Sequence, residues 1–249
     1  MKTLCFFNEK GGVGKTTHSV LFASYLAYHR KARVLVYDFE PEPRINRIRN
    51  SELKSLADPS GVLSRYLLAS GVPDACYDIR CPASGVDVSD EGFINGLTSG
   101  FQSLVDSGDY DYVIFDFPAG RQASSIVALC FSISFIDLCC IPVDTDSMTR
   151  RCGMFTADMA RQNCVKPVLF WNNVSQAEIA SKGLLKQGQE VYERFGFRFL
   201  NTKIKTFAKA RRDSDSKLFV RSTLCFPMKY VNMYCPELVS LYEEILAEF

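Results

Sequence analysis

The chain has almost no excess of charge of either sign. Its 249 residues include 29 Lys and Arg against 28 Asp and Glu, a formal net charge of +1. A nearly neutral protein has no overall field to steer a nucleic acid, so any such partner has to be held by a local basic patch. An apolar content of 47% excludes a disordered chain. The length predicts one α/β domain spanning residues 1–249.

The sequence also lacks the features of a secreted or membrane-bound protein. No basic and apolar leader precedes the first predicted strand, so we expect a cytoplasmic protein. The longest apolar stretch, residues 124–143, contains Asp137 and Pro142, whereas a membrane span needs about 20 uninterrupted apolar residues. We therefore predict a helix followed by a buried strand in this stretch, and no stable membrane association.

The ten cysteines do not have the spacing of a metal site. No Cys-x-x-Cys pair occurs, and the adjacent Cys139 and Cys140 are predicted to point to opposite sides of a strand. In a reducing cytoplasm such cysteines act mainly as small buried hydrophobic residues. We expect this structural role for them, rather than a metal or iron–sulfur cluster.

The most informative segment is a glycine-rich turn between a strand and a helix, Glu9–Thr17. Glycines in such a turn let backbone N–H groups close around phosphate oxygens, and the following helix N-terminus adds partial positive charge. Lys15 is predicted to contact the β- and γ-phosphates, and the Thr16 hydroxyl to bind Mg²⁺. The predicted nucleotide-binding residues of the loop are Gly11, Gly12, Val13, Gly14, Lys15, Thr16 and Thr17.

Apolar runs alternate with helical patterns along the whole chain, which predicts a doubly wound, mostly parallel sheet flanked by helices. The predicted strands are Thr3–Asn8, Arg33–Asp38, Val86–Val88, Tyr112–Phe117, Leu138–Val143, Val168–Asn172 and Phe199–Ile204. The predicted helices are Lys15–His29, Gly61–Ala69, Gly92–Asp106, Gln122–Ser132, Thr149–Asn163, Gln176–Phe195 and Glu237–Glu248. Ligands of such a fold bind beyond the carboxyl ends of the strands.

Acidic residues stand at two of these strand ends. Asp38 and Glu40 close the second strand, and Asp116 follows four apolar residues and precedes Pro118-Ala119-Gly120. An Asp in this position after a phosphate-binding loop is typical of a Mg²⁺ ligand. We predict Thr16, Asp38 and Asp116 as the residues around the metal.

A second lysine inside the loop, Lys10, gives the sequence Lys-Gly-Gly-Val-Gly-Lys-Thr-Thr. This resembles the deviant Walker A motif of the ParA/MinD family of ATPases, with the ParA-like partition ATPases as the nearest group. The resemblance implies a P-loop ATPase fold, ATP and Mg²⁺ as cofactors, and an ATP-dependent homodimer in which Lys10 contacts the partner's nucleotide. It also implies catalytic roles for Lys10, Lys15 and Glu40, the last by positioning the attacking water.

The chain departs from the family pattern at Glu40 and at the nearby Glu42. Where ParA-like proteins read Asp-x-Asp-Pro-Gln, this chain reads Asp38-Phe39-Glu40-Pro41-Glu42. Hydrolysis requires the attacking water to be held in a fixed geometry, and nucleotide binding is less sensitive to such geometry. We therefore expect slow hydrolysis that waits for an activator, such as a ParB-like protein.

Two amide side chains, Asn172 and Asn173, stand at the end of the strand predicted to start at Val168. An amide offers a donor and an acceptor that match the adenine edge, and the family resemblance implies a base-reading Asn here. We favour Asn172; Asn173, and a simple turn role for either residue, remain alternatives.

Basic residues gather late in the chain, between Arg198 and Lys229. Such a patch could hold DNA phosphates without reading bases, and the family resemblance implies non-specific DNA binding in this region. An ordinary solvated surface is the alternative. The candidate DNA-contacting residues are Lys205, Lys209, Arg211 and Arg212.

Three functions stay open at this point. The first is a partition-type switch, chromosomal or carried by a mobile element, that would be nucleoid-associated when bound to ATP. The second is a MinD-like positioning ATPase, which needs a basic amphipathic C-terminal helix, whereas this chain ends in a segment with Glu237, Glu243, Glu244 and Glu248. The third is a metabolic P-loop enzyme for a small molecule. His18 and His29 are expected to be ordinary residues of the first helix.

Overall fold

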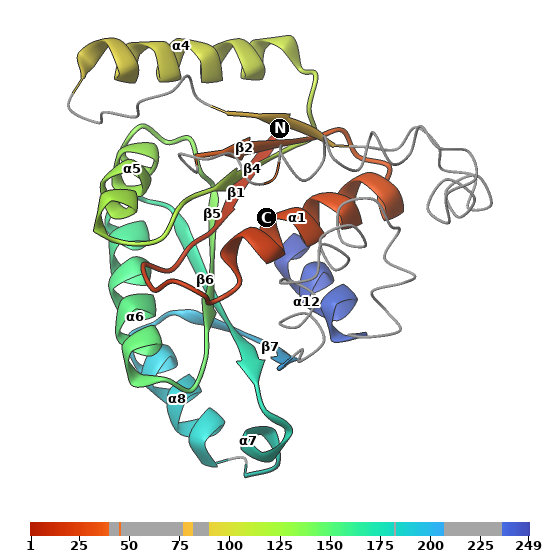
Figure 1. Ribbon diagram of the computed structural model, residues 1–249, viewed down its shortest axis with the longest axis vertical. Coiled ribbons are helices and arrows are strands. Elements are labelled where there is room, and N and C mark those ends of the chain that lie inside the picture. Colours follow the sequence, from red (N-terminus) through yellow and green to blue (C-terminus); the bar gives the residue numbers. More distant parts are fainter. Residues whose placement is uncertain (40–44, 46–76, 82–89, 182, 207–235) are drawn as a thin grey trace.

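A computed structural model of the chain describes residues 1–39, 45, 77–81, 90–181, 183–206 and 236–249 (Figure 1). Its centre is a parallel sheet of seven strands in the order β3-β2-β4-β1-β5-β6-β7. The strands are β1 Lys2–Phe6, β2 Val34–Asp38, β3 Asp78–Arg80, β4 Tyr112–Asp116, β5 Leu138–Val143, β6 Lys166–Val174 and β7 Arg198–Lys205. The predicted α/β fold with a doubly wound parallel sheet is confirmed.

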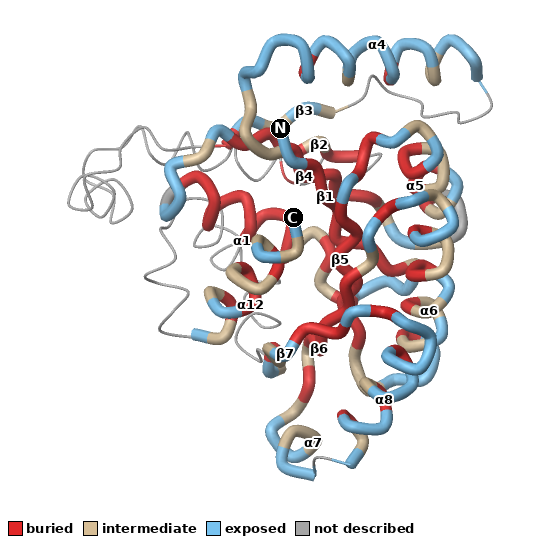
Figure 2. The backbone as a smooth tube through the Cα atoms, turned by 180° about the vertical axis from the view of Figure 1, so that it is seen from behind, coloured by how far each residue is buried: buried red, intermediate tan, exposed pale blue. Residues whose placement is uncertain are grey.

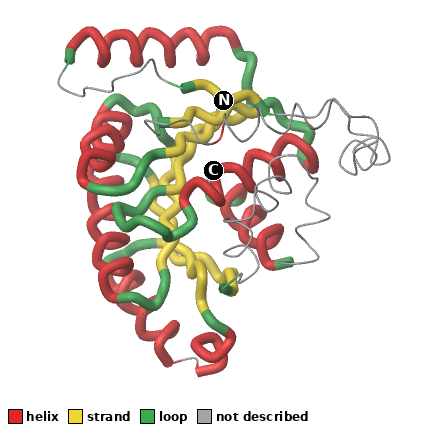
Figure 3. The backbone as a smooth tube through the Cα atoms, in the orientation of Figure 1, coloured by secondary structure: helices red, strands yellow, loops and turns green. Residues whose placement is uncertain are grey.

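Helices cover both faces of the sheet (Figures 1 and 3). One face carries α1 and α12, and the other carries α5, α6 and α8. The described helices are α1 Lys15–Ser24 with the π-helical turn η1 Tyr25–His29, α4 Glu91–Ser107, α5 Arg121–Ser132, α6 Ser147–Gln162, α7 Gln176–Ser181, α8 Gly183–Arg194 and α12 Glu237–Leu246.

The strands are buried on both sides, as Figure 2 shows, because each face of the sheet has its own apolar core. Successive residues of a strand point to opposite faces. Cys139 accordingly lies in the core under α5 and α6, and Cys140 in the core under α1 and α12. The predicted opposite orientation of this pair is confirmed.

The apolar stretch 124–143 forms part of α5 and then β5, as predicted. Among the described helices none is both long and apolar enough to cross a membrane. The stretch is apolar because β5 lies in the middle of the sheet, where all six of its residues are buried.

The structure differs from the predicted elements in two places, and two further predicted elements are not described. The edge strand β3 lies at Asp78–Arg80 and was not predicted, since its three residues include two charges and are largely exposed. The helix predicted over Gln176–Phe195 is instead two helices, α7 and α8. The strand predicted at Val86–Val88 and the helix predicted at Gly61–Ala69 lie outside the described residues.

The strand order determines where a ligand site can form. Strand β1 lies between β4 and β5, and β4 lies between β1 and β2. Because all these strands are parallel, the carboxyl ends of β1, β2 and β4 meet side by side at one edge. The segments that follow these three strands are the glycine-rich loop, the residues after Asp38 and the residues after Asp116.

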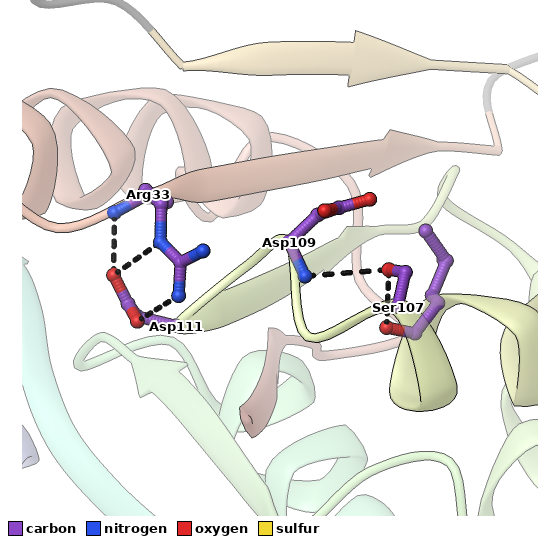
Figure 4. Close-up of polar contacts among 5 residues, drawn as sticks. Arg33, Ser107, Asp109 and Asp111 are labelled. Carbon is purple, nitrogen blue, oxygen red and sulfur yellow. Dashed lines mark hydrogen bonds and ion pairs between the residues drawn. The ribbon is translucent and has the colours of Figure 1, made fainter.

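At the opposite edge, Arg33 and Asp111 fasten the starts of β2 and β4 together (Figure 4). The backbone N–H of Arg33 and its guanidinium Nη2 each donate to the Asp111 carboxylate at 2.8 Å. These hydrogen bonds lower the pKa of the Asp111 carboxyl. Nearby, the backbone N–H of Asp109 donates to Ser107 Oγ at 3.3 Å where α4 ends.

We predict that Asp111→Asn lowers the free energy of unfolding at pH 7 by less than about 1 kcal/mol, because the ion pair is largely exposed. The carboxyl pKa lies below its ordinary value of 3.8 in the folded protein. The ion pair therefore makes its full contribution to the free energy of unfolding above pH 3.8. This contribution is lost as the pH falls through the lower pKa of the folded protein. Urea unfolding at pH 7 and pH 3 measures this. Asp109→Asn is the control, and an equal loss in both variants would contradict a role of the ion pair.

Candidate functional site

The glycine-rich loop connects β1 to the first turn of α1. Gly14 has a φ of +92°, which disfavours a side chain, and a Cβ there would lie 2.8 Å from the Asn172 amide nitrogen. No side chain caps α1 at Gly14, so the N-terminus of this helix faces the loop without a carboxylate or hydroxyl cap. An anion in the loop would meet backbone N–H groups and the positive end of the helix dipole.

The two lysines of the loop are placed differently. Lys15 is only 6% exposed, and its Nζ donates to the carbonyl oxygens of Asn8 and Lys10, each at 3.0 Å. Its ammonium is thus held inside the loop, where phosphate oxygens could replace the carbonyls. Lys10, by contrast, has an exposed side chain at the outer edge.

Asn8 anchors the loop to two other elements and was not singled out in the sequence. This residue is fully buried; its Nδ2 donates to Pro142 O of β5 at 3.0 Å and to Thr149 O of α6 at 3.2 Å. Its Oδ1 accepts from the Lys10 backbone N–H at 3.1 Å. A polar residue at the end of an apolar strand, directly before the loop, was the available signal.

The two predicted metal-binding carboxylates lie side by side. Asp38 and Asp116 are register partners at the ends of β2 and β4, and both side chains are fully buried. Side chains of register partners share one face of the sheet, here the face that α1 covers, since Ser19 of α1 donates its hydroxyl to Asp116 Oδ1 at 2.9 Å.

These residues fit a divalent cation. Two adjacent buried carboxylates repel each other unless a proton or a cation lies between them, and Mg²⁺ prefers carboxylate and hydroxyl oxygens. Thr16 precedes Ser19 by three residues and therefore lies one turn nearer the loop on the same side of α1. The structure thus brings the predicted metal-binding set, Thr16, Asp38 and Asp116, to one end of α1.

The segment after Asp116 touches the loop directly. The Gly120 N–H donates to Glu9 O at 3.1 Å, and a Cβ on Gly11 would be in van der Waals contact with Ala119. The predicted water-positioning residue, Glu40, lies outside the described residues. Its role stays a prediction.

Asn172 reaches the loop from the end of β6. Its Nδ2 donates to Val13 O at 2.7 Å, and the side chain is buried. The neighbouring Asn173 has a positive φ of 59° and is half-buried. The structure places Asn172 beside the loop, while its contact with a base stays a prediction.

His18 is more buried than expected of an ordinary helix residue. It is 3% exposed and lies under the loop, and burial lowers its pKa to about 4, against a smaller opposing effect of a hydrogen bond with Asn172. The ring is therefore neutral at physiological pH. A histidine on the buried side of α1 was visible in the sequence, but its partners come from distant elements.

Of the candidate DNA-contacting residues, the structure describes Lys205. This residue ends β7, and its Nζ lies 2.8 Å from Glu237 Oε1 at the start of α12. The other three, Lys209, Arg211 and Arg212, lie outside the described residues. DNA binding by this region stays a prediction.

We predict that Asn8→Ala lowers the free energy of unfolding by about 1–3 kcal/mol, because it leaves buried carbonyl oxygens of Pro142 and Thr149 without this donor. It should also weaken the binding of ATP by loosening the loop. Asn163→Ala, which removes one amide hydrogen bond to Met159 O at the other end of α6, is the control. Calorimetric titration tests this, and equal ATP affinity in the two variants would contradict the anchoring role.

Comparisons with known proteins agree with this geometry. Residues 1–58 match the family model described as an AAA domain. A segment of 41 residues is 54% identical to the chromosome-partitioning ATPase Soj of Treponema pallidum, and this match covers 16% of each chain.

Solved structures match over much more of the chain. The MinD cell division protein of Aquifex aeolicus is similar over 100% of this chain and 98% of its own, with a TM-score of 0.65 and 15% identity. The pNOB8 ParA protein bound to nonspecific DNA is similar over 87% of this chain and 84% of its own, with a TM-score of 0.53 and 17% identity. The solved structures show that the described chain has the fold of ParA and MinD proteins, its first 58 residues are similar in sequence to an AAA domain, and a segment of 41 residues is similar to a partitioning ATPase.

Proposed function

We propose that this protein is a ParA-like switch that binds ATP and Mg²⁺, closes into an ATP-sandwich dimer, and binds DNA without sequence preference in that state. The proposal rests on one observation: the two lysines of the loop differ in burial. Lys15 is buried inside the loop, whereas Lys10 is exposed at its edge. The first suits a bound phosphate, and the second suits a nucleotide held by another subunit.

ATP would bind with its phosphates in the loop 9–17 and its base toward Asn172. Lys15 would exchange its two carbonyl acceptors for phosphate oxygens, and Thr16, Asp38 and Asp116 would hold Mg²⁺ directly or through water. The metal supplies positive charge that offsets the charge developing on the transferred phosphoryl group. Glu40 would orient the attacking water. Because it is one methylene longer than the family's aspartate, hydrolysis would be slow and stimulated by a partner such as a ParB-like protein.

The position of Lys10 supports a dimer across the loop. The pKa of Asp146, at the start of α6, is lowered by hydrogen bonds from the backbone N–H groups of Thr149 and Met148, and in smaller part by the charge of Lys10. Lys10 is exposed and its charge acts on Asp146, so its ammonium is available at the surface of the loop. A nucleotide sandwiched between two subunits places several negative charges at such a surface, and a lysine from each side would offset them.

DNA binding is supported by the basic residues that start with Lys205 and by the fold shared with a ParA protein solved on nonspecific DNA. A dimer would double the number of phosphate contacts and so bind DNA far more strongly than a monomer. The protein would then be cytoplasmic, and associated with the nucleoid when it holds ATP.

The second candidate, a membrane-bound positioning ATPase, is less well supported. Helix α12 buries Leu238, Leu241, Tyr242 and Ile245 against the core, so its apolar face is already covered. Its exposed side carries glutamates rather than the lysines and arginines that anionic lipid attracts.

We predict that the wild type forms a dimer with a slowly hydrolysed ATP analogue and not with ADP, and that Lys10→Ala stays monomeric while still binding the nucleotide. The reason is that Lys10 contributes to the partner's site and Lys15 to its own. Lys186→Ala, at an exposed position on α8, is the control and should dimerise normally. Analytical ultracentrifugation with each nucleotide measures this.

The same samples should be tested on random duplex DNA. Binding should require the ATP analogue, weaken steeply with salt, and be lost in Arg211→Glu/Arg212→Glu. An ATP-dependent dimer with no affinity for DNA would contradict the DNA-binding part of the proposal and would favour a protein or membrane partner. A protein that binds ATP and remains a monomer would refute the role of Lys10 and favour a small-molecule enzyme.

A further inference from the structure

His18 lies between the phosphate-binding loop and the C-terminal helix α12. Phe6 stacks on its ring with 5.4 Å between ring centroids, and Phe170 meets it edge-on at 5.1 Å. These contacts fix the plane of the ring. Because His18, Asn172 and Tyr242 are all buried, their polar atoms need partners inside the protein.

The directions of the hydrogen bonds follow from the chemistry of each group. A carbonyl oxygen only accepts, so Asn172 has to present its Nδ2 to Val13 O, at 2.7 Å. The amide oxygen of Asn172 then remains as an acceptor, and a hydrogen bond with Asn172 raises the pKa of His18 against the larger effect of burial. At the other side of the ring, His18 Nδ1 lies 3.3 Å from the hydroxyl oxygen of Tyr242 on α12.

A neutral imidazole has one donor and one acceptor nitrogen. The Cδ2 and Nε2 edge of the ring lies close to Gly14, where the Asn172 amide also lies. In the tautomer with its proton on Nε2, the ring would donate to the Asn172 amide oxygen, and Nδ1 would accept from the Tyr242 hydroxyl. This tautomer would give a chain of hydrogen bonds in one direction, from Tyr242 through His18 and Asn172 to Val13 O.

Helix α12 is also attached to the chain that precedes it. Lys205 at the end of β7 pairs with Glu237 at the start of α12, so the end of this strand and the start of this helix are held together. Further along α12, Glu243 contacts Tyr25 and Arg30 at the end of the first helix.

We propose that His18 is a positioning residue that couples the phosphate-binding loop to α12, by donating to Asn172 and accepting from Tyr242. The inference rests on the proposed function, because a bound nucleotide is what would alter the loop. A nucleotide that shifts Val13 and Gly14 would change the contacts of Asn172 and His18. The hydrogen bond between His18 and Tyr242 would change as a result. By reciprocity, a change at α12 alters the affinity for the nucleotide.

The first test uses the protein without nucleotide. Nitrogen-15 NMR of the imidazole reports which ring nitrogen carries the proton, and the hydrogen-bond chain requires it on Nε2. In Tyr242→Phe the Nδ1 resonance of His18 should move, because its donor is gone. A proton on Nδ1 in the wild type, or an unchanged Nδ1 resonance in Tyr242→Phe, would overturn the proposal.

The second test measures the coupling with a slowly hydrolysed ATP analogue. Tyr242→Phe, which is outside the loop, should weaken the affinity for the analogue about 3- to 10-fold, and His18→Phe should weaken it further. Tyr25→Phe is the matched control, since it also removes a hydroxyl at the α12 interface but lies outside the hydrogen-bond chain. Its affinity should stay within about twofold of the wild type.

Hydrogen exchange separates coupling from a merely structural role. The nucleotide should slow amide exchange in α12 of the wild type and of Tyr25→Phe, but not of Tyr242→Phe. If both tyrosine variants lose thermal stability while keeping wild-type affinity and exchange response, the coupling is refuted and the proposed function stands. A wild type that binds no nucleotide refutes the proposed function together with the coupling.

Discussion

The register between β2 and β4 is the constraint on which the site depends. It places Asp38 directly beside Asp116, both fully buried on the face that α1 covers. A shift by one residue would turn one of the two carboxylates to the opposite face of the sheet. The apolar residues that precede them, buried in the cores on both faces, maintain this register. The sheet thus holds two carboxyl groups side by side, a pairing that a shared proton or a cation stabilises.

The loop depends on this sheet in turn. Asn8 fastens its start to β5 and α6, Asn172 fastens its middle to β6, and the Gly120 N–H joins it to the segment after β4. These three attachments come from elements on both sides of β1. The loop conformation is therefore set by tertiary contacts, and Gly14 is required both by its positive φ and by the closeness of Asn172.

Most of the fold and the centre of the site could be predicted from the sequence, because buried parallel strands and a phosphate-binding loop have strong local signals. The loop, Asp116 and the strand ends all follow from short patterns. The roles of Asn8 and Tyr242 could not be predicted, since their partners are more than 100 residues away and no local pattern specifies them. Strand β3 was missed because an exposed edge strand with two charges of three residues lacks the apolar signal of the central strands.

We propose that the loop and the two buried carboxylates form one site for ATP with Mg²⁺. The most direct measurement is the affinity for a fluorescent ATP analogue with Mg²⁺ and with EDTA, in the wild type and in Asp116→Asn. We expect the wild type to bind tightly only with Mg²⁺, and the effect of Mg²⁺ to be largely lost in Asp116→Asn. Equal affinity with Mg²⁺ and with EDTA, or no binding at all by the folded wild type, would contradict it.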